Sequence, residues 1–445
     1  MKLLKKVLNV SILFVLILFT SSTFIFANNT TIPKGNSTNV DEVNTYSPIC
    51  LIMESKTGKV IYNKNGYEKA FPASTTKIMT AILAIENCEL TDKATASYNA
   101  IFTVPYDYTN ANIHVGEELT INQLLHVLLI PSANDAANVL AEHIAGSIES
   151  FATMMNTKAE ELGCINTHFV NANGLHDENH YSTAYDLALM GRYAMKYDIF
   201  RKIVATSVYT LPATNKYAEN DRVFGNTNYL IRKNDSDGVD NYYYEYANGI
   251  KTGYTNAAHN CLVASAKKND KEYIVVILGA STTENGLSER FLDSKALFEY
   301  AFNNYTTKTI YESNSVLKTI KIKNGNIFDN NLDVVIQDEI SPVTKNDTNL
   351  SNINPTIEIE SELKAPIVKN TVIGKITYII DGNEYTSNLI AGKDIQESRF
   401  FNILFIIIAL IFIIFLLKKL LMPKNKKGGK YKKRKAKYYS NNNYN

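Results

Sequence analysis

One segment near the C-terminus constrains the chain more than any other: residues 400–417 are apolar except for Asn402. Such a run is long enough for a helix that crosses a membrane when flanking side chains reach the interfaces. Eleven Lys and Arg residues and no acid follow in residues 418–445, and basic flanks stay on the cytoplasmic side. We therefore predict a single transmembrane helix over 400–417, a basic cytoplasmic tail over 418–445, and an extracytoplasmic location for the preceding domains.

The N-terminal segment has the pattern of an export signal. Residues 1–27 contain three lysines, then an apolar run, then small residues before Ala27, which is typical of a secretory signal peptide. An uncleaved N-terminal anchor is the alternative, because the apolar stretch continues to Phe26. Residues 28–45 are rich in Asn, Thr and Ser, which indicates a linker.

The distribution of charge argues against nucleic-acid binding. The formal net charge is +2, but residues 28–417 carry about −12 once the basic tail and the three N-terminal lysines are set aside. The positive charge thus lies in the two terminal segments that set the orientation in the membrane, and it does not indicate a binding surface for nucleic acid. We expect the cell membrane as a partner of the C-terminal helix and no nucleic acid.

The cysteines are widely and irregularly spaced. No C-x-x-C occurs, so neither a zinc ribbon nor a redox pair is supported. Two disulfides are one interpretation for an exported protein, but we favour four small, free hydrophobic residues. The four positions are Cys50, Cys88, Cys164 and Cys261.

Residues 46–305 mix strands and helices. Strand-like segments occur at 249–255, 261–266 and 272–278, and helical spacing occurs at 121–129, 135–145 and 293–302. Grouping of this kind predicts an α+β domain and not a doubly wound sheet. Residues 306–395 have alternating stretches such as 315–322, 356–363 and 372–380, so we predict a second, all-β domain that acts as a spacer before the membrane.

Ser74 and Lys77 are candidates for a nucleophile and its base. They lie three residues apart after Pro72, at the expected start of a helix, so their side chains share one face. A serine hydroxyl needs a base, and a lysine serves only if burial or neighbouring cations lower its pKa. Three further Ser-x-x-Lys copies lie in strand-like sequence, where i and i+3 point to opposite faces: Ser265/Lys268, Ser315/Lys318 and Ser361/Lys364.

A second motif, Ser132-Ala133-Asn134, lies at a predicted corner between two helices. There a hydroxyl and an amide could enter a cleft, the first to relay a proton and the second to hold a substrate carbonyl or the lysine. A helix N-cap is the alternative role. Ser97-Tyr98-Asn99 is a competing match, which we reject because no helical corner is predicted around it.

A third motif, Lys251-Thr252-Gly253, lies on a predicted strand beside a hairpin. A lysine and a threonine on an edge strand, with a glycine that permits close approach of a ligand backbone, suit the binding of a carboxylate. A second Lys-Thr-Gly at 56–58 precedes the nucleophile and indicates only a hairpin turn.

Together the three motifs, each in a fitting helix, corner or strand, form the set found in penicillin-binding proteins and β-lactamases. The chain resembles that superfamily and, within it, the low-molecular-weight D-alanyl-D-alanine carboxypeptidases. The resemblance covers residues 47–305 strongly and the β domain loosely. It implies an antiparallel sheet flanked by helices, with a helical subdomain. The stretches that carry it are 71–80, 131–137, 182–188, 251–255 and 363–367.

The resemblance also implies an activity. A serine-type carboxypeptidase removes the terminal D-alanine from peptidoglycan stem pentapeptides through an acyl-enzyme, and penicillin and other β-lactams inhibit it covalently. Ser74 would attack the substrate carbonyl, Lys77 would take its proton, and Ser132 would pass a proton to the leaving amine. No metal or cofactor is expected.

The same resemblance assigns substrate contacts. Backbone N–H groups of Ser74 and Tyr254 would form the oxyanion hole. Better-known relatives often have His at the position of Tyr254, so this side of the site departs from the family pattern. The residues implied to bind substrate are Asn134, Lys251, Thr252, Gly253 and Arg290, the last with Lys251 and Thr252 at the terminal carboxylate.

Three other activities compete. A D,D-endopeptidase that cuts peptidoglycan crosslinks has the same catalytic parts, although Arg290 favours a free carboxylate. A β-lactamase needs a glutamate-bearing loop, and Glu178 lies in no such setting. His176 and His180 could suggest a zinc peptidase, but the segment looks like a loop and lacks the H-E-x-x-H order. A non-enzymatic wall-binding protein would be expected to have lost Ser74 or Lys77.

Overall fold

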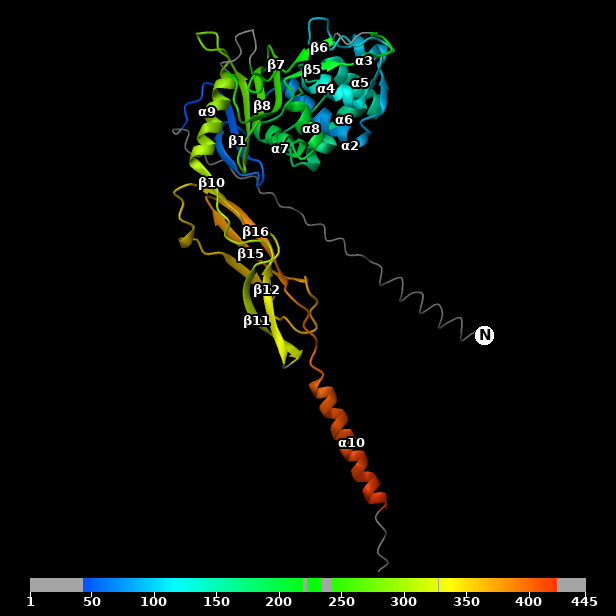
Figure 1. Cartoon of the computed structure of the whole chain (residues 1–445), viewed down its shortest axis with the longest axis vertical. Coiled ribbons are helices and arrows are strands. Elements are labelled where there is room, and N and C mark those ends of the chain that lie inside the picture. The colour runs from blue at the N-terminus through cyan, green and yellow to red at the C-terminus, as the bar shows by residue number, and fades with distance from the viewer. Residues whose placement is uncertain (1–42, 219–221, 234–241, 327, 422–445) are drawn as a thin grey trace, which may run out of the picture. The chain divides into compact units, whose positions relative to one another are not determined.

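The computed structural model describes residues 43–218, 222–233, 242–326 and 328–421. The predicted signal peptide, all but the end of the predicted linker, and residues 422–445 of the predicted tail lie outside the described residues. The chain divides into two compact units (Figure 1), the first ending at Asn304 and the second beginning at Tyr305.

The first unit is built on a five-stranded antiparallel sheet with the order β2-β1-β9-β8-β7. The three predicted strand segments fall within β7, β8 and β9, and Asn269 takes a positive φ of 55° at the β8–β9 turn. β7 is an edge strand, as expected for the Lys-Thr-Gly segment. The strands are β1 (Ile49–Glu54), β2 (Val60–Lys64), β7 (Ala247–Thr255), β8 (His259–Lys268) and β9 (Lys271–Ala280).

Helices cover both faces of this sheet. On β9, Tyr273 meets Phe302 of α9 (Glu289–Asn304), whereas the next residue, Ile274, lies near Gly191 of α7 (Ala184–Ala194). Because neighbouring residues of a strand point to opposite faces, α9 and α7 pack on opposite sides. The sheet is therefore buried on both faces, which explains its continuous apolar runs.

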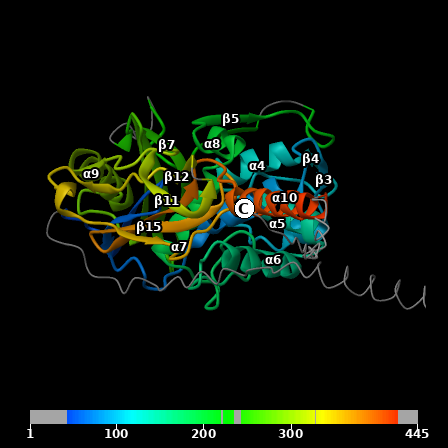
Figure 2. The ribbon, with the colours of Figure 1, turned by 90° about the horizontal axis from the view of Figure 1, so that it is seen from below.

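A helical subdomain lies beside the sheet, and Figure 2 shows its α4, α5 and α6 away from α9. α4 begins with a capping box between Thr120 and Gln123, and α5 ends at Gly146 with a positive φ of 79°. These signals explain why both helices were predicted within one residue of their ends. The helices are α2 (Lys77–Asn87), α4 (Ile121–Leu129), α5 (Asn134–Ala145), α6 (Ile148–Glu161) and α8 (Asp198–Val204).

Short elements border the subdomain. No helical corner was expected around Ser97-Tyr98-Asn99. That expectation is wrong, because the Ser97 side chain accepts from Ala100 N and caps a short helix over Tyr98–Phe102. These elements are β3 (Lys93–Thr95), α3 (Tyr98–Phe102), β4 (Glu118–Thr120), and the hairpin of β5 (Val208–Leu211) and β6 (Arg222–Gly225).

The second unit contains a five-stranded antiparallel sheet with the order β11-β12-β16-β15-β14. The strand expected over 356–363 is shorter than predicted, because pairing with β15 ends at Ile359. A long apolar helix, α10 (Phe400–Leu421), follows. The strands are β10 (Tyr305–Thr307), β11 (Val316–Asn326), β12 (Asp329–Ile336), β13 (Val343–Lys345), β14 (Thr356–Ile359), β15 (Val372–Ile380) and β16 (Asn383–Ala391).

The cysteines and α10 match their predicted characters. All four cysteines are free, and Cys50, Cys164 and Cys261 are buried. Within α10, Ile403–Leu421 has a mean hydropathy of 2.9 and is long and apolar enough to cross a membrane.

Candidate active site

Ser74 lies in a tight turn where a regular α-helix was expected to begin. Ala73–Thr76 forms a 3₁₀ turn, and α2 starts at Lys77. Ala73 has a φ of 47°, a conformation that costs energy in a non-glycine residue and often marks functional sites. The turn points the Ser74 hydroxyl towards the Lys77 amine, with 2.8 Å between Oγ and Nζ.

Two glycines allow this turn to pack tightly. A methyl group on Gly174 would lie 2.0 Å from the carbonyl oxygen of Ala73, and one on Gly253 would lie 3.0 Å from Ser74 N. Gly253 was expected to make room for a ligand backbone. The structure shows that it also makes room for the turn that carries Ser74.

Lys77 is fully buried, and its amine has three hydrogen-bonding neighbours. Nζ lies 2.7 Å from Asn134 Oδ1 and 2.6 Å from the carbonyl oxygen of Asn173, besides Ser74 Oγ. Burial lowers the pKa of Lys77 well below its ordinary value, and the nearby Lys251 cation lowers it further. Both effects favour the uncharged form of the amine, whereas the Asp135 carboxylate opposes them.

The corner between α4 and α5 brings the second motif to the same place. Ser132 has a φ of 75°, and it lines the cleft that Ser74 also lines. Asn134 accepts from Lys77 through Oδ1, and its Nδ2 donates to the carbonyl oxygen of Thr109 at 2.9 Å. The amide is therefore oriented from both ends.

The third motif lies across the cleft. Lys251 is 1% exposed, and burial together with the Arg290 cation lowers its pKa to about 7. Arg290 donates through Nη1 to the carbonyl oxygens of Gly253 and Cys261, at 3.0 and 3.3 Å. Its Nε is buried without a hydrogen-bond partner among the described residues, and Arg290 contributes to the lining of the cleft, so the rim presents a cation there.

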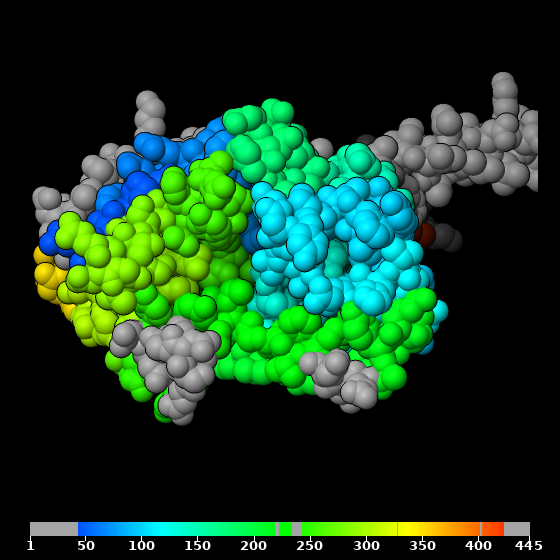
Figure 3. Space-filling model, turned by 90° about the horizontal axis from the view of Figure 1, so that it is seen from above, coloured from blue at the N-terminus to red at the C-terminus, as the bar shows by residue number. Residues whose placement is uncertain are grey.

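These groups meet in one open cleft with a volume of about 380 Å³. In Figure 3 a furrow separates the part of the chain around residues 100–120 from the strands that follow residue 245. Three of the predicted site residues are buried beneath the lining residues and do not line the cleft themselves, namely Lys77, Asn134 and Lys251. The lining residues include Ser74, Asp107, Tyr108, Thr109, Ser132, Thr227, Thr252, Gly253, Tyr254, Asn256 and Arg290.

Comparison with known proteins agrees with this geometry. A family model described as D-alanyl-D-alanine carboxypeptidase matches residues 35–282, more than half of the chain. The chain belongs to the D-alanyl-D-alanine carboxypeptidase family. A second model, the C-terminal domain of penicillin-binding protein 5, matches residues 305–397. The resemblance inferred from the motifs, the serine-hydrolase class and the two-part fold are thereby confirmed.

Individual members of the family are similar over most of their length. The chain is 34% identical to D-alanyl-D-alanine carboxypeptidase DacF of Bacillus subtilis, covering 80% of this chain and 87% of that protein. It is 30% identical to DacC of Escherichia coli, covering 79% and 84%. The crystal structure of penicillin-binding protein 5 from Haemophilus influenzae superimposes with a TM-score of 0.65 at 25% identity, covering 80% and 98%.

Several residues of this carboxypeptidase site were not anticipated from sequence. Asn173 and Thr109 contribute backbone carbonyls, which any residue carries, so no residue type could have revealed them. Thr227 hydrogen-bonds Thr252 through their hydroxyls at 2.5 Å. Asp135 accepts the backbone N–H groups of Ala111 and Ile113 at 3.0 Å, and its place directly after the Ser-x-Asn motif was an available signal.

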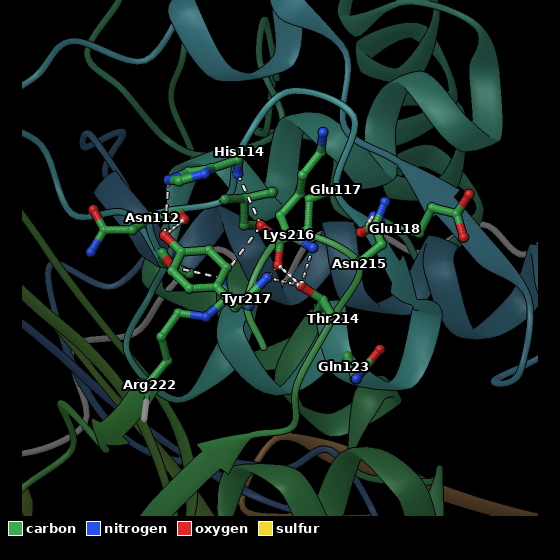
Figure 4. Close-up of polar contacts among 12 residues, drawn as sticks. Asn112, His114, Glu117, Glu118, Gln123, Thr214, Asn215, Lys216, Tyr217 and Arg222 are labelled. Atoms are coloured by element: carbon green, nitrogen blue, oxygen red, sulfur yellow. Dashed lines mark hydrogen bonds and ion pairs between the residues drawn. The ribbon is translucent and has the colours of Figure 1, made fainter. Parts of the chain in front are cut away.

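A buried ion pair braces the wall of the carboxypeptidase cleft (Figure 4). Glu117, fully buried, accepts from Arg222 of β6 at 2.5 Å and from Thr214 at 2.7 Å. The Arg222 guanidinium also lies 3.8 Å from the centre of the Tyr217 ring, whose hydroxyl donates to the Asn112 carbonyl. The pair ties the segment that carries Thr109 to the β5–β6 hairpin that leads to Thr227.

Proposed function

We propose that the first unit cleaves the bond before the terminal D-alanine of peptidoglycan stem peptides, with Ser74 as nucleophile and Lys77 as base. One observation carries this assignment: Lys77 Nζ is buried 2.8 Å from Ser74 Oγ, between two carbonyl acceptors. An uncharged amine has two N–H donors and one lone pair. With Asn134 Oδ1 and Asn173 O taking the two donors, the lone pair is left to accept the Ser74 proton.

The proposed reaction has two halves. Ser74 Oγ attacks the carbonyl carbon, and its proton passes to Lys77. The C–N bond breaks, a proton reaches the leaving D-alanine amine through Ser132, and an ester remains on Ser74. Water then hydrolyses the ester and restores the serine. The backbone N–H groups of Ser74 and Tyr254 are assigned to the oxyanion, at a turn and strand whose backbones nearly touch.

The cationic rim is proposed to select a free carboxylate. Lys251, Thr252 and Arg290 would bind the C-terminal group of the stem peptide, and Arg290, which lines the cleft, is the guanidinium available for it. Asn134 is assigned to the substrate amide. The β-lactam carboxylate would occupy the same rim and place the lactam carbonyl at Ser74. Attack by Ser74 Oγ would open the lactam C–N bond and leave the antibiotic covalently bound as an ester.

We further propose the topology inferred from sequence. The domains are a signal peptide at 1–27, a linker at 28–45, the catalytic domain at 46–305 and the β domain at 306–395. The segment 400–417 would anchor the chain by one pass, with residues 418–445 in the cytoplasm. The exposed apolar surface of α10 supports the anchor.

A fluorescent penicillin tests the nucleophile. Full-length protein is incubated with the probe and denatured, and the covalent label is measured. Ser74→Ala is expected to abolish labelling. The control is Ser315→Ala, in the non-catalytic Ser315/Lys318 match of the second unit, which is expected to label like wild type. A labelled Ser74→Ala protein would refute the assignment.

Product analysis then tests the substrate. Release of free D-alanine from a stem pentapeptide is expected to exceed cleavage of a crosslinked peptide dimer and of a β-lactam. Faster cleavage of the dimer would assign the site to a D,D-endopeptidase instead.

A further inference from the structure

Four aromatic side chains are exposed within residues 98–108, and the last of them, Tyr108, lines the catalytic cleft. Beyond these residues the described part of the first unit exposes large apolar side chains only singly along the chain, the nearest being Val115, seven positions after Tyr108. Exposed apolar clusters of this kind mark binding surfaces more often than chance. The four, which we call the aromatic platform, are Tyr98 (69% exposed), Phe102 (64%), Tyr106 (100%) and Tyr108 (37%).

The platform is held in place by polar contacts beneath it. Tyr98 and Phe102 lie one turn apart on α3, and their rings stack with centroids 4.4 Å apart. Ser97 and Asn99 both donate to the carboxylate of Glu142 on α5. These contacts present the rings to solvent on a fixed support, so binding a partner would cost little ordering of the protein.

Hydrogen bonds connect the platform to the catalytic centre at two points. Asn138 donates to the carbonyl oxygen of Ala100 in α3 at 3.1 Å and accepts from Asn173 Nδ2 at 3.0 Å. The Asn173 carbonyl in turn accepts from Lys77. At the other end Tyr108 lines the cleft itself, next to the Thr109 carbonyl that holds Asn134. The platform therefore shares a hydrogen-bonded framework with the cleft, and its last residue, Tyr108, lies in the cleft lining.

We propose that the aromatic platform binds the glycan strand to which the stem peptide is attached, an inference that rests on the proposed function. A pyranose ring has faces of C–H groups and a rim of polar groups, so it can cover an aromatic ring while its hydroxyls stay in water. A stem of five residues spans at most about 17 Å. The sugar that carries a peptide bound at Ser74 must therefore lie near the rim of the cleft, where the platform begins.

Comparing two substrates distinguishes an effect on this subsite from an effect on the catalytic centre. kcat/KM for D-alanine release by the full-length protein is measured with a free stem pentapeptide and with the same peptide attached to a glycan tetrasaccharide. Removing both stacked rings in Tyr98→Ala/Phe102→Ala is expected to lower kcat/KM about tenfold for the glycan-borne substrate and less than twofold for the free peptide. Tyr98→Phe keeps the ring and is expected to behave like wild type.

A matched control removes an exposed ring elsewhere in the first unit. Tyr46 is 66% exposed and is absent from the cleft lining, so Tyr46→Ala is expected to leave both substrates unchanged. Equal losses on both substrates, or no loss on either, would overturn the proposal. A change in the molecular mass of the detergent-solubilised double variant would also overturn it, because the platform would then be a contact between copies of the chain.

A binding measurement with a ligand that cannot be cleaved tests the glycan subsite separately from the proposed carboxypeptidase function. A peptide-free tetrasaccharide of alternating N-acetylglucosamine and N-acetylmuramic acid is titrated into wild type and into the double variant, with calorimetry as readout. Binding that is lost in the double variant supports the subsite even if no D-alanine is released. Equal binding, or none, would refute the subsite while leaving the proposed function intact.

Discussion

The two units differ in the kind of polar side chain that they bury. The first unit encloses charged side chains, among them Lys77, Asp135 and Lys251, within a large apolar core. In the described residues of the second unit the buried polar side chains are uncharged, namely Ser341, Thr344 and Ser387. Burying a charge without compensation destabilises a fold. Strongly perturbed pKa values of buried groups often mark functional sites, and in the described residues only the first unit has buried charged side chains.

The largest expected effect comes from removing the buried amine of Lys77, which we propose as the base. Lys77→Met is expected to slow penicillin acylation about 10³-fold, because general-base assistance is lost. Methionine removes the cost of burying an amine but leaves Asn134 Oδ1 and Asn173 O without their donor. The thermal unfolding temperature of the first unit is therefore measured alongside, to show that the variant is folded at the assay temperature. Lys318→Met, in the non-catalytic Ser315/Lys318 match of the second unit, serves as control. A labelling rate within tenfold of wild type would contradict the assigned role.

Breaking the buried ion pair is expected to cost stability. Glu117→Ala leaves the Arg222 charge buried and uncompensated, which destabilises by about 3–5 kcal/mol. Chemical denaturation followed by tyrosine fluorescence measures it. The neighbouring residue is the control, because the Lys93–Glu118 pair is exposed and Glu118→Gln is expected to cost at most about 1 kcal/mol. Similar losses in the two variants would show that burial is not the cause.

A cavity in the second unit should leave catalysis intact. Ile376 is fully buried in β15, and Ile376→Ala is expected to destabilise that unit by about 3 kcal/mol. Penicillin labelling is expected to stay at the wild-type rate, because all cleft residues belong to the first unit. Ile379→Ala, on the same strand but 66% exposed, is the matched control. Impaired labelling by Ile376→Ala would contradict the functional separation.

The smallest expected effect is a pH dependence. Burial and Arg290 lower the pKa of Lys251 to about 7, so raising the pH through that value removes the cation proposed to bind the substrate carboxylate. kcat/KM for D-alanine release is expected to fall about tenfold per pH unit above the pKa. Lys251→Arg keeps its charge and should move the fall to higher pH. A flat profile between pH 7 and 9 would rule out this role.

Local patterns predicted much of the first unit. The copy Ser265/Lys268 was rejected because a strand points i and i+3 to opposite faces, and it lies on β8. The capped helices and the β8–β9 turn were predicted because their signals span a few residues. α3 was missed because five residues carry little periodicity, and its cap forms only with Ala100 in place.

The sequence by itself determined the identity and order of the three motifs, the antiparallel strands that follow residue 245 and the apolar C-terminal helix, because motif order, alternation and apolar length are local properties. Only the tertiary structure decided what surrounds Lys77. Its Asn173 partner is 96 positions away in the chain, and its depressed pKa depends on burial and on Lys251 across the cleft. Both the Asn173 contact and the lowered pKa depend on many contacts between segments that are far apart in the chain. The spacing of residues in the sequence therefore cannot predict them.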